Sequence, residues 1–342
     1  MHMKRLISER SVWPSPHFVQ EHRQDMVAVC AELVTGLTSS PARLAPKYFY
    51  DALGSRLFDA ITELDEYYPT RTEAAIFRAG AREMARHVAA GAVWFDLGAG
   101  SCAKAASLFG VMRPGAYVPI DISVDYLRGS VAALQERHPA LPMLGLGLDF
   151  SSALELPAEA DAWLSGHDLR AAARCVFYPG SSIGNFAPDE ALRLLGQARA
   201  LCDGGGAGSG LLIGVDRVKA KAVLDLAYDD ALGVTAAFNR NLLRHVNRLL
   251  GSDIQPAHWR HVAFYNEAES RIEMHLQAVG AQTVAWPGGQ RTFADGERLH
   301  TENSYKWTPE AFEGLLRQAG FGEVTHWSDE RGWFSVFWAQ AS

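Results

Sequence analysis

The stretch that decides the fold is AVWFDLGAGSCA, residues 92–103, in which a short apolar run ends at an aspartate and two glycines. Such a run is typical of a buried strand followed by a tight turn, because glycine adopts backbone angles that other residues avoid. Gly98 and Gly100 would also let a ligand approach the backbone closely. We therefore expect a ligand-binding turn at the end of a buried parallel strand.

Further apolar runs follow at residues 116–121, near 146–149, and at 175–178 and 211–216. Helical patterns separate them, for example over residues 124–137 and 189–202. This alternation predicts a parallel α/β sheet covered on both faces, which right-handed crossovers make doubly wound. The runs at 323–327 and 334–338 predict an antiparallel hairpin that completes the sheet.

The pattern changes outside this block. Residues 217–250 read as almost continuous helix, a less regular stretch follows to about 303, and residues 1–71 lack parallel-strand runs. We therefore predict a sheet domain from residues 72–216 and 304–342, and a second, discontinuous domain from residues 1–71 and 217–303. The functional site should lie where the two meet, because pockets favour domain interfaces and the carboxyl ends of strands.

The composition narrows the class of protein. The chain has 342 residues, 48% of them hydrophobic, and a net charge of −7, which argues against a basic nucleic-acid-binding surface. It has no apolar run long enough for a membrane span and no apolar core of a signal peptide at its N-terminus. The four cysteines lack C-x-x-C spacing, which favours reduced thiols. We expect a soluble, cytoplasmic enzyme or binding protein.

The glycine turn alone leaves two cofactor classes open. Gly98, Gly100 and Ala103 fit the G-x-G-x-x-A form of the dinucleotide fingerprint. Asp121 ends the next strand, where a carboxylate can bind the two hydroxyls of a ribose. A NAD-dependent oxidoreductase is therefore one interpretation of this turn.

Two other acidic residues favour S-adenosylmethionine over NAD. Asp96, directly before the turn, could face an ammonium or sulfonium group instead of a pyrophosphate. Asp149 could accept from an adenine amino group beside the aromatic ring of Phe150. The alternative is that Asp96 and Asp149 are merely the polar ends of buried strands.

Longer motifs carry a more specific resemblance. They are KYFYD at 47–51, YYPTRTE at 67–73, GSSIGNF at 180–186, YDD at 228–230, GVTAAFNRN at 233–241, RIEM at 271–274 and TENSYK at 301–306. In this order they resemble the histidine-specific methyltransferase family that trimethylates L-histidine in ergothioneine biosynthesis. The resemblance runs from about residue 40 to 340. It implies a class I methyltransferase (Rossmann-like) sheet with a split substrate domain, and S-adenosyl-L-methionine as cofactor. The products would be S-adenosyl-L-homocysteine and hercynine, Nα,Nα,Nα-trimethyl-L-histidine.

The same resemblance implies which residues form the site. Cofactor contacts map to Tyr50, Gly98, Lys104, Asp121, Asp149 and Phe150. Substrate contacts map to Tyr67, Asn185, Tyr228, Met274, Glu302 and Ser304. Tyr67 and Asn185 are the candidate catalytic residues.

The substrate set suits the chemistry of free histidine. The Asn185 amide and the Tyr228 hydroxyl are neutral donors for a carboxylate. Glu302 can accept from an imidazole N–H, Ser304 can donate to or accept from the other nitrogen, and Met274 can pack on the ring. Residues 302 and 304 share one face if the segment is extended. Each residue also has a purely structural alternative. Asn185 could cap a turn or helix and Tyr228 could be a core tyrosine, while Glu302 could be a solvated loop carboxylate and Met274 a core residue.

The reaction would be an in-line displacement in which a neutral amine attacks the methyl carbon. A desolvated pocket lowers the pKa of the amine and so supplies the neutral form. Tyr67 would position the amine, directly or through water, and we do not assign it as a strong base. Most of the catalysis should come from orienting two bound reactants.

Other functions stay open at this point. A related enzyme could methylate another amino acid or amine such as tryptophan, although Glu302 argues against an apolar side chain. A noncatalytic sensor of the same ligands is a further class. We expect a small-molecule amino acid as substrate, no nucleic acid, no membrane partner and a monomer. The 12 histidines show no H-E-x-x-H or similar ligand set, so we expect no metal.

Overall fold

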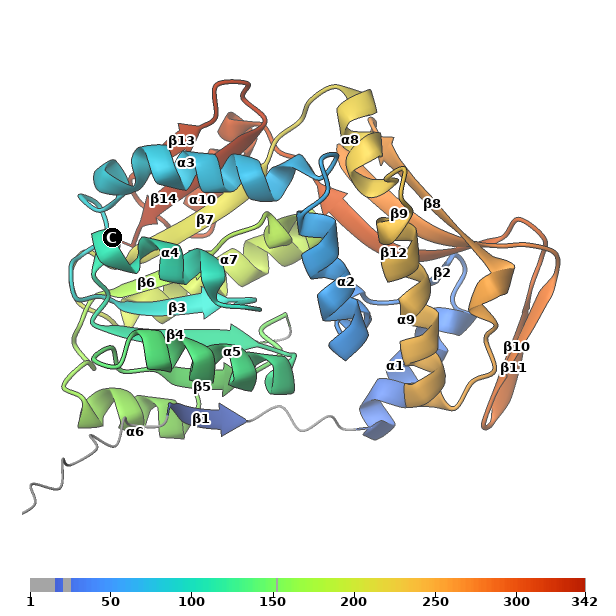
Figure 1. The fold of residues 1–342 in the computed structure, drawn as a ribbon, viewed down its shortest axis with the longest axis horizontal. Helices are drawn as coiled ribbons and strands as arrows, with labels where there is room; N and C mark the ends of the chain where they lie inside the picture. Colours follow the sequence, from blue (N-terminus) through green and yellow to red (C-terminus); the bar gives the residue numbers. More distant parts are fainter. Residues whose placement is uncertain (1–15, 21–25, 152, 342) are drawn as a thin grey trace, which may run out of the picture.

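The computed structural model describes residues 16–20, 26–151 and 153–341. Its main feature is an eight-stranded sheet with the order β1-β5-β4-β3-β6-β7-β14-β13 (Figure 1). The strands are β1 (His17–Gln20), β3 (Val93–Leu97), β4 (Ala116–Asp121), β5 (Leu144–Gly147), β6 (Arg174–Tyr178), β7 (Gly210–Asp216), β13 (Val324–Ser328) and β14 (Phe334–Gln340). From β1 to β7 neighbouring strands are parallel, whereas β14 is antiparallel to β7 and forms a hairpin with β13. The five predicted buried strands and the terminal hairpin are confirmed, in the order of a class I methyltransferase sheet.

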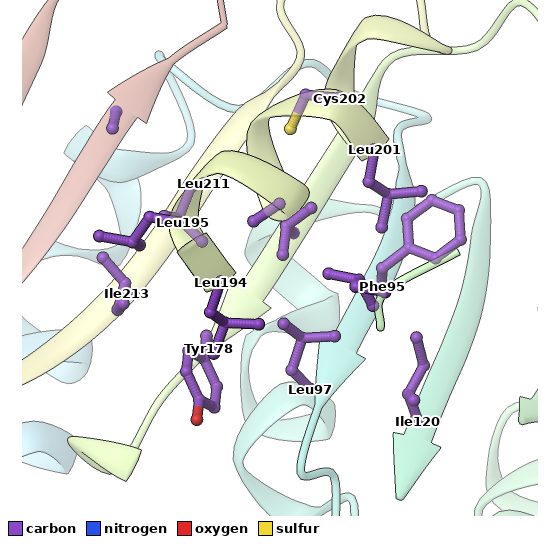
Figure 2. Close-up of a cluster of buried hydrophobic side chains, with 14 of the residues drawn as sticks. Phe95, Leu97, Ile120, Tyr178, Leu194, Leu195, Leu201, Cys202, Leu211 and Ile213 are labelled. Atoms are coloured by element: carbon purple, nitrogen blue, oxygen red, sulfur yellow. The ribbon is translucent and has the colours of Figure 1, made fainter. Parts of the chain in front are cut away.

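Helices cover both faces of this sheet because alternate side chains of each buried strand point to opposite faces. One face packs against α6 (Ala158–Gly166), α7 (Pro188–Asp203) and α10 (Pro309–Gln318). Figure 2 shows this core, where Leu194 and Leu201 of α7 lie over Phe95 and Leu97 of β3. The other face packs against α3 (Tyr68–Met84), α4 (Ala103–Met112) and α5 (Val124–Arg137).

A second, smaller sheet lies beside the carboxyl ends of the main strands (Figure 1). Its order is β2-β12-β9-β8, and a separate β10–β11 hairpin extends from it. The bounds are β2 (Ala42–Arg43), β8 (Trp259–Asn266), β9 (Arg271–Ala278), β10 (Gln282–Trp286), β11 (Gly289–Phe293) and β12 (Arg298–Tyr305). The helices of this unit are α1 (Met26–Thr38), α2 (Ala52–Thr62), α8 (Lys221–Tyr228) and α9 (Val234–Leu250). They share one hydrophobic core with the second sheet.

The segment 251–303 differs from the sequence prediction. We expected an irregular stretch, and the structure places five strands there, β8 to β12. Glu273, His275, Thr301 and Glu302 are all buried in these strands. Because polar side chains occupy inward positions, the apolar alternation that identifies a half-buried strand is broken. Helices α8 and α9 agree with the helical pattern predicted over 217–250.

The N-terminal part also differs from the prediction. Residues 1–71 were predicted to lack parallel strands, but β1 pairs in parallel with β5 at the edge of the main sheet. A four-residue edge strand carries too little sequence pattern to be recognised. Residues 1–15 and 21–25 lie outside the described residues. The division into two domains with the stated boundaries stays a prediction. Across the described ranges, no helix is long and apolar enough to cross a membrane.

Candidate active site

Two adjoining cavities lie between the main sheet and the second unit. The larger, with about 1800 Å³ of empty space including the part open to solvent, lies at the ends of β3, β4 and β5. The smaller, with about 580 Å³ measured in the same way, lies deeper against β9 and β12. Four residues line both cavities: Tyr50, Phe58, Ser182 and Asn185. A ligand in one cavity can therefore touch a ligand in the other.

The glycine turn lines the larger cavity, as predicted from the sequence. Gly98 and Gly100 have φ angles of +67° and +50°, in the left-handed region that glycine adopts without strain. The backbone N–H groups of Gly100 and Ser123 donate to the two oxygens of Asp121, at 2.9 and 2.8 Å. These bonds hold the Asp121 carboxylate at the end of β4, at the cavity wall. Burial raises the pKa of this carboxyl above its usual value.

Asp149 and Phe150, directly after β5, form another part of the same wall. Asp149 accepts from the backbone N–H of Ser151 at 3.1 Å and lies 3.6 Å from the Lys47 ammonium. Phe150 packs edge-on against Tyr178, with ring centroids 5.7 Å apart. An acidic group beside a fixed aromatic ring therefore faces the cavity.

Two residues that were expected to face the cofactor do not line either cavity. The Asp96 carboxylate is buried and accepts from the Tyr117 hydroxyl at 2.6 Å. Its role as the partner of a ligand cation stays a prediction. Burial raises the pKa of this carboxyl to about 7. Lys104 donates to Glu73 at 2.8 Å, at the start of α4 behind the turn. Its role as a cofactor contact stays a prediction.

The smaller cavity brings together all six predicted substrate residues from distant segments. Tyr67 precedes α3, Asn185 ends a 3-10 turn (Ser182–Asn185) after β6, and Tyr228 ends α8. Met274 lies on β9, while Glu302 and Ser304 lie on β12. Sequence spacing alone placed only Glu302 and Ser304 together, so tertiary structure assembles the rest.

Strand pairing explains the arrangement of the β-strand residues. Glu302 of β12 pairs directly with Met274 of the antiparallel strand β9. Directly opposed residues project from the same face of a sheet, and so do residues two positions apart on one strand. Glu302, Met274 and Ser304 therefore share the face that lines the cavity.

The loop that carries Asn185 is fixed by tight packing and a buried carboxylate. The backbone N–H of Gly180 donates to Glu73 at 2.7 Å. A Cβ atom on Gly184 would lie 2.8 Å from the carbonyl oxygen of Tyr305, so a larger side chain would push the loop away from β12. Gly184 thus lets the Asn185 loop approach the strand that carries Ser304.

Five aromatic rings form a continuous wall from the larger cavity into the smaller one. Tyr50 and Phe58 have centroids 5.8 Å apart, and Phe58 and Tyr67 are separated by 6.3 Å. Tyr67 continues to Tyr228 at 6.2 Å, and Phe238 packs 5.8 Å from Tyr50. Burial raises the pKa of the Tyr67 and Tyr228 hydroxyls well above the usual value, so both stay protonated near neutral pH.

Glu302 is a buried carboxyl whose oxygens accept no hydrogen bond from any residue that the structure describes. Burial raises its pKa to about 8, while the nearby Lys306 ammonium acts in the opposite direction. A buried carboxylate without a hydrogen-bond donor is costly, so a ligand N–H group that donates to Glu302 would stabilise its ionised form strongly. Glu302 is therefore prepared to receive an N–H group.

A network of charged residues lies beneath the cavity, and the sequence analysis did not identify it. The Lys306 ammonium lies 2.8 Å from Asp216 and donates to Ser304 at 2.8 Å and to Tyr228 at 3.0 Å. Lys219 pairs with the other oxygen of Asp216 at 2.6 Å. Burial would raise the pKa of Asp216, but these two ammonium groups outweigh burial and lower it. The available signals were Asp216 at the end of a strand and Lys306 in the TENSYK motif.

The sequence matches one family model and is similar to several characterised proteins over most of its length. The sequence model of a family described as histidine-specific methyltransferase, SAM-dependent, matches residues 29–341. A histidine N-alpha-methyltransferase of Mycolicibacterium smegmatis is 40% identical over 316 residues, which are 90% of this chain and 94% of that protein. The enzyme with the same name from Mycobacterium tuberculosis is 38% identical, covering 91% of this chain and 94% of its own. Ergothioneine biosynthesis protein 1 of Neurospora crassa is 29% identical over 88% of this chain and 34% of that protein.

Proposed function

Because this chain belongs to the family of S-adenosylmethionine-dependent, histidine-specific methyltransferases, we propose that it methylates the α-amino nitrogen of L-histidine. Three transfers give hercynine, the trimethyl product used in ergothioneine biosynthesis. The observation that carries this proposal is the smaller cavity, which holds Glu302 and Ser304 on one strand face and joins the larger cavity. L-histidine needs a pocket with partners for an imidazole ring, which the smaller cavity offers. S-adenosylmethionine needs a nucleoside-sized cavity beside it, which the larger one offers.

The residues of the larger cavity fit S-adenosylmethionine. Asp121 is held by two backbone N–H groups at the end of β4, where it can accept from the two ribose hydroxyls. Asp149 can accept from the adenine amino group, and Phe150 gives the adenine an apolar face. Gly98 and Gly100 line this cavity and present no side chain to the ligand. When bound, the cofactor supplies an electrophilic methyl group on a sulfonium.

The smaller cavity orients the amino acid from both ends. The Asn185 amide and the Tyr228 hydroxyl can donate to its carboxylate, since both groups line the cavity and neither carries a charge. Glu302 can accept from one imidazole nitrogen, Ser304 can bond the other, and Met274 gives the ring a polarisable wall. An apolar amino acid would leave Glu302 buried without a partner, which disfavours it strongly.

The amine must reach the junction of the two cavities as a neutral group. Tyr67 keeps its proton near neutral pH, so it can position the amine or a bridging water but does not act as a strong base. The amine lone pair forms the new N–C bond as the C–S bond breaks, and the thioether keeps that electron pair. After the first and second transfers the methylated ammonium releases a proton to water, which restores the lone pair for the next transfer; after the third it has no proton to release. Holding both reactants in line can supply roughly 7–11 kcal/mol of the rate enhancement.

Mass spectrometry of the purified enzyme with S-adenosylmethionine and each amino acid in turn tests this function. We expect mono-, di- and trimethylated histidine, and turnover of tryptophan at most at a trace level. Turnover of another amine without turnover of histidine would replace the substrate. Calorimetric binding of NADH without binding of S-adenosylhomocysteine would overturn the cofactor. Tight binding of both ligands without turnover would indicate a sensor.

The setting of the enzyme belongs to the same proposal. The four cysteines are free thiols in the structure, which agrees with a reducing cytoplasm. We propose a monomer, which size-exclusion chromatography with light scattering tests directly.

A further inference from the structure

Lys306 is a fully buried lysine that the proposed reaction does not use. Lys306 follows β12 directly, two residues after Ser304, and its ammonium lies behind the side chains that line the smaller cavity. An isolated buried ammonium is costly, so a buried lysine needs a counter-ion and hydrogen-bond acceptors. The question is what the three N–H groups of this ammonium do to the site.

Three oxygens surround the ammonium at hydrogen-bond distance. Asp216 supplies a carboxylate oxygen at 2.8 Å and so provides the counter-charge. The Ser304 and Tyr228 hydroxyl oxygens accept from Lys306 at 2.8 and 3.0 Å. A lysine has three N–H donors and no acceptor, so this set uses all of them. Each of the two hydroxyls must accept from Lys306 and cannot donate to it.

This constraint fixes the direction of both hydroxyl groups. With a lone pair turned to the ammonium, each O–H hydrogen points away from Lys306. Tyr228 donates to Ser304 at 2.8 Å, which leaves the Ser304 hydrogen available to a ligand. When a carboxylate takes the Tyr228 hydrogen, Ser304 still keeps its bond from Lys306. The ammonium also repels a second cation at the same oxygen, because like charges at such short range are destabilising.

From this geometry we propose that Lys306 is a positioning residue that makes Ser304 a hydrogen-bond donor, so that the site selects the neutral imidazole ring. The inference rests on the proposed function and specifies the form of its substrate. The bare ring nitrogen accepts from Ser304, and the ring N–H donates to Glu302. An imidazolium ring has two N–H groups and no bare nitrogen, so it would face the Ser304 hydrogen and the Lys306 charge together.

The charges around the site agree with this assignment. Lys306 and Lys219 are cations, and Asp216 is an anion between them. An ionised Glu302 brings the sum of these four charges to zero, and a neutral ring keeps it there. Binding then requires that Glu302 release its proton to solvent wherever it is protonated beforehand. Tyr50, Tyr67 and Tyr228 also face the cavity and add no charge near neutral pH.

The direct test uses ¹⁵N magnetic resonance of ring-labelled histidine bound to the wild-type enzyme together with S-adenosylhomocysteine. At about pH 6 free histidine is mostly imidazolium, because its ordinary pKa is about 6.5. We expect the bound ring to show one pyridine-type and one pyrrole-type nitrogen. Two pyrrole-type nitrogens would mean a bound imidazolium and would overturn the inference. This measurement needs no variant, so a folding failure cannot obscure it.

A second test measures discrimination between ligands that differ only at the bare nitrogen. The 2- and 3-pyrrolyl analogues of histidine keep one ring N–H and replace the other nitrogen by C–H. We expect Lys306→Met to reduce the preference for histidine over the better analogue by about tenfold, because Ser304 then loses its fixed direction. Ser304→Ala should reduce the same ratio, and adding Lys306→Met to it should cause no further fall.

Lys219→Met is the matched control, since Lys219 contacts Asp216 and Tyr68 but neither site hydroxyl. It removes a buried partner of the same carboxylate and should leave the preference unchanged. Lys306→Arg keeps the charge and should retain part of the preference. Calorimetry with S-adenosylhomocysteine confirms that each variant is folded. An unchanged preference in folded Lys306→Met, or an equal fall in Lys219→Met, would overturn the inference. Wild-type enzyme without histidine turnover would instead defeat the proposed function.

Discussion

The two cavities are built in different ways. The larger one is formed largely by consecutive turns at the ends of β3, β4 and β5, and backbone N–H groups hold its main carboxylate, Asp121. The smaller one is formed by side chains from segments far apart in the sequence, with a buried acid and a buried ion-pair network behind it. This contrast teaches that the first site depends on local backbone geometry, whereas the second depends on how the two units pack.

The largest expected effect comes from removing the buried acid of the smaller cavity. Glu302→Ala should lower kcat/KM for histidine by about a thousandfold, because the ring N–H then has no acceptor in a desolvated pocket. Binding of S-adenosylhomocysteine should stay unchanged, since Glu302 does not line the larger cavity. Steady-state kinetics and calorimetry measure the two quantities. If selectivity for histidine over tryptophan survives, Glu302 does not bind the imidazole.

A smaller effect is expected from a substitution in the larger cavity, and it should weaken binding of the cofactor instead of histidine. Asp121→Ala should weaken S-adenosylhomocysteine binding by about thirtyfold, since the variant loses the ribose acceptor and the anchor of two backbone N–H groups. Asp121 does not line the smaller cavity, so KM for histidine should change little. Asp125→Ala, at an exposed position in the first turn of α5, is the control and should bind as the wild type. Equal affinities in Asp121→Ala and Asp125→Ala would remove Asp121 from the ribose site.

Asn185 lines both cavities, so substitutions there test whether histidine binding and cofactor binding can be changed independently. Asn185→Ala should raise KM for histidine by about tenfold, through the loss of one donor to its carboxylate. Asn185→Asp should raise it further, because the new carboxylate repels that of the substrate. Cofactor affinity should change by less than about threefold in both variants. A larger change in cofactor affinity than in KM would assign Asn185 to the cofactor instead.

The smallest effect concerns stability. The pKa of Glu302 is raised to about 8 in the folded protein, so the native state keeps a proton that the unfolded chain loses near its ordinary value. The free energy of unfolding therefore falls as pH rises toward 8. Glu302→Gln cannot titrate, and its advantage in Tm over the wild type should grow by a few degrees between about pH 5 and pH 8.5. A difference in Tm that does not vary with pH would contradict the raised pKa.

The larger cavity was predictable because its signals are local. A buried apolar run, two glycines and an aspartate at the end of the next strand lie within about 30 residues, and the structure brings them together as expected. The expectation that Asp96 partners a ligand cation also rested on a local signal, and it stays a prediction. Its position before the turn says nothing about Tyr117 of the neighbouring strand, which binds its carboxylate.

The smaller cavity could be predicted only through the resemblance to a family. Taken alone, Tyr228 or Met274 is indistinguishable from a core residue. Lys306 and Asp216 are far apart in the sequence, and nothing in their own segments indicates that they form an ion pair. The five strands of residues 259–305 were missed because their inward positions carry acids and histidines. Where the interior of a protein is polar for its function, apolar periodicity stops marking the strands.

The wall of five aromatic rings has a consequence for the end of the reaction cycle. After the third transfer the nitrogen has no N–H left to donate and carries a permanent positive charge under the proposed function. The faces of aromatic rings attract such quaternary ammonium groups through cation–π interactions. Tyr50 and Phe58 line both cavities and Tyr67 lines the smaller one, so the surface that admits the amine would also stabilise the betaine. Under the proposed function we expect product release, rather than methyl transfer, to limit turnover.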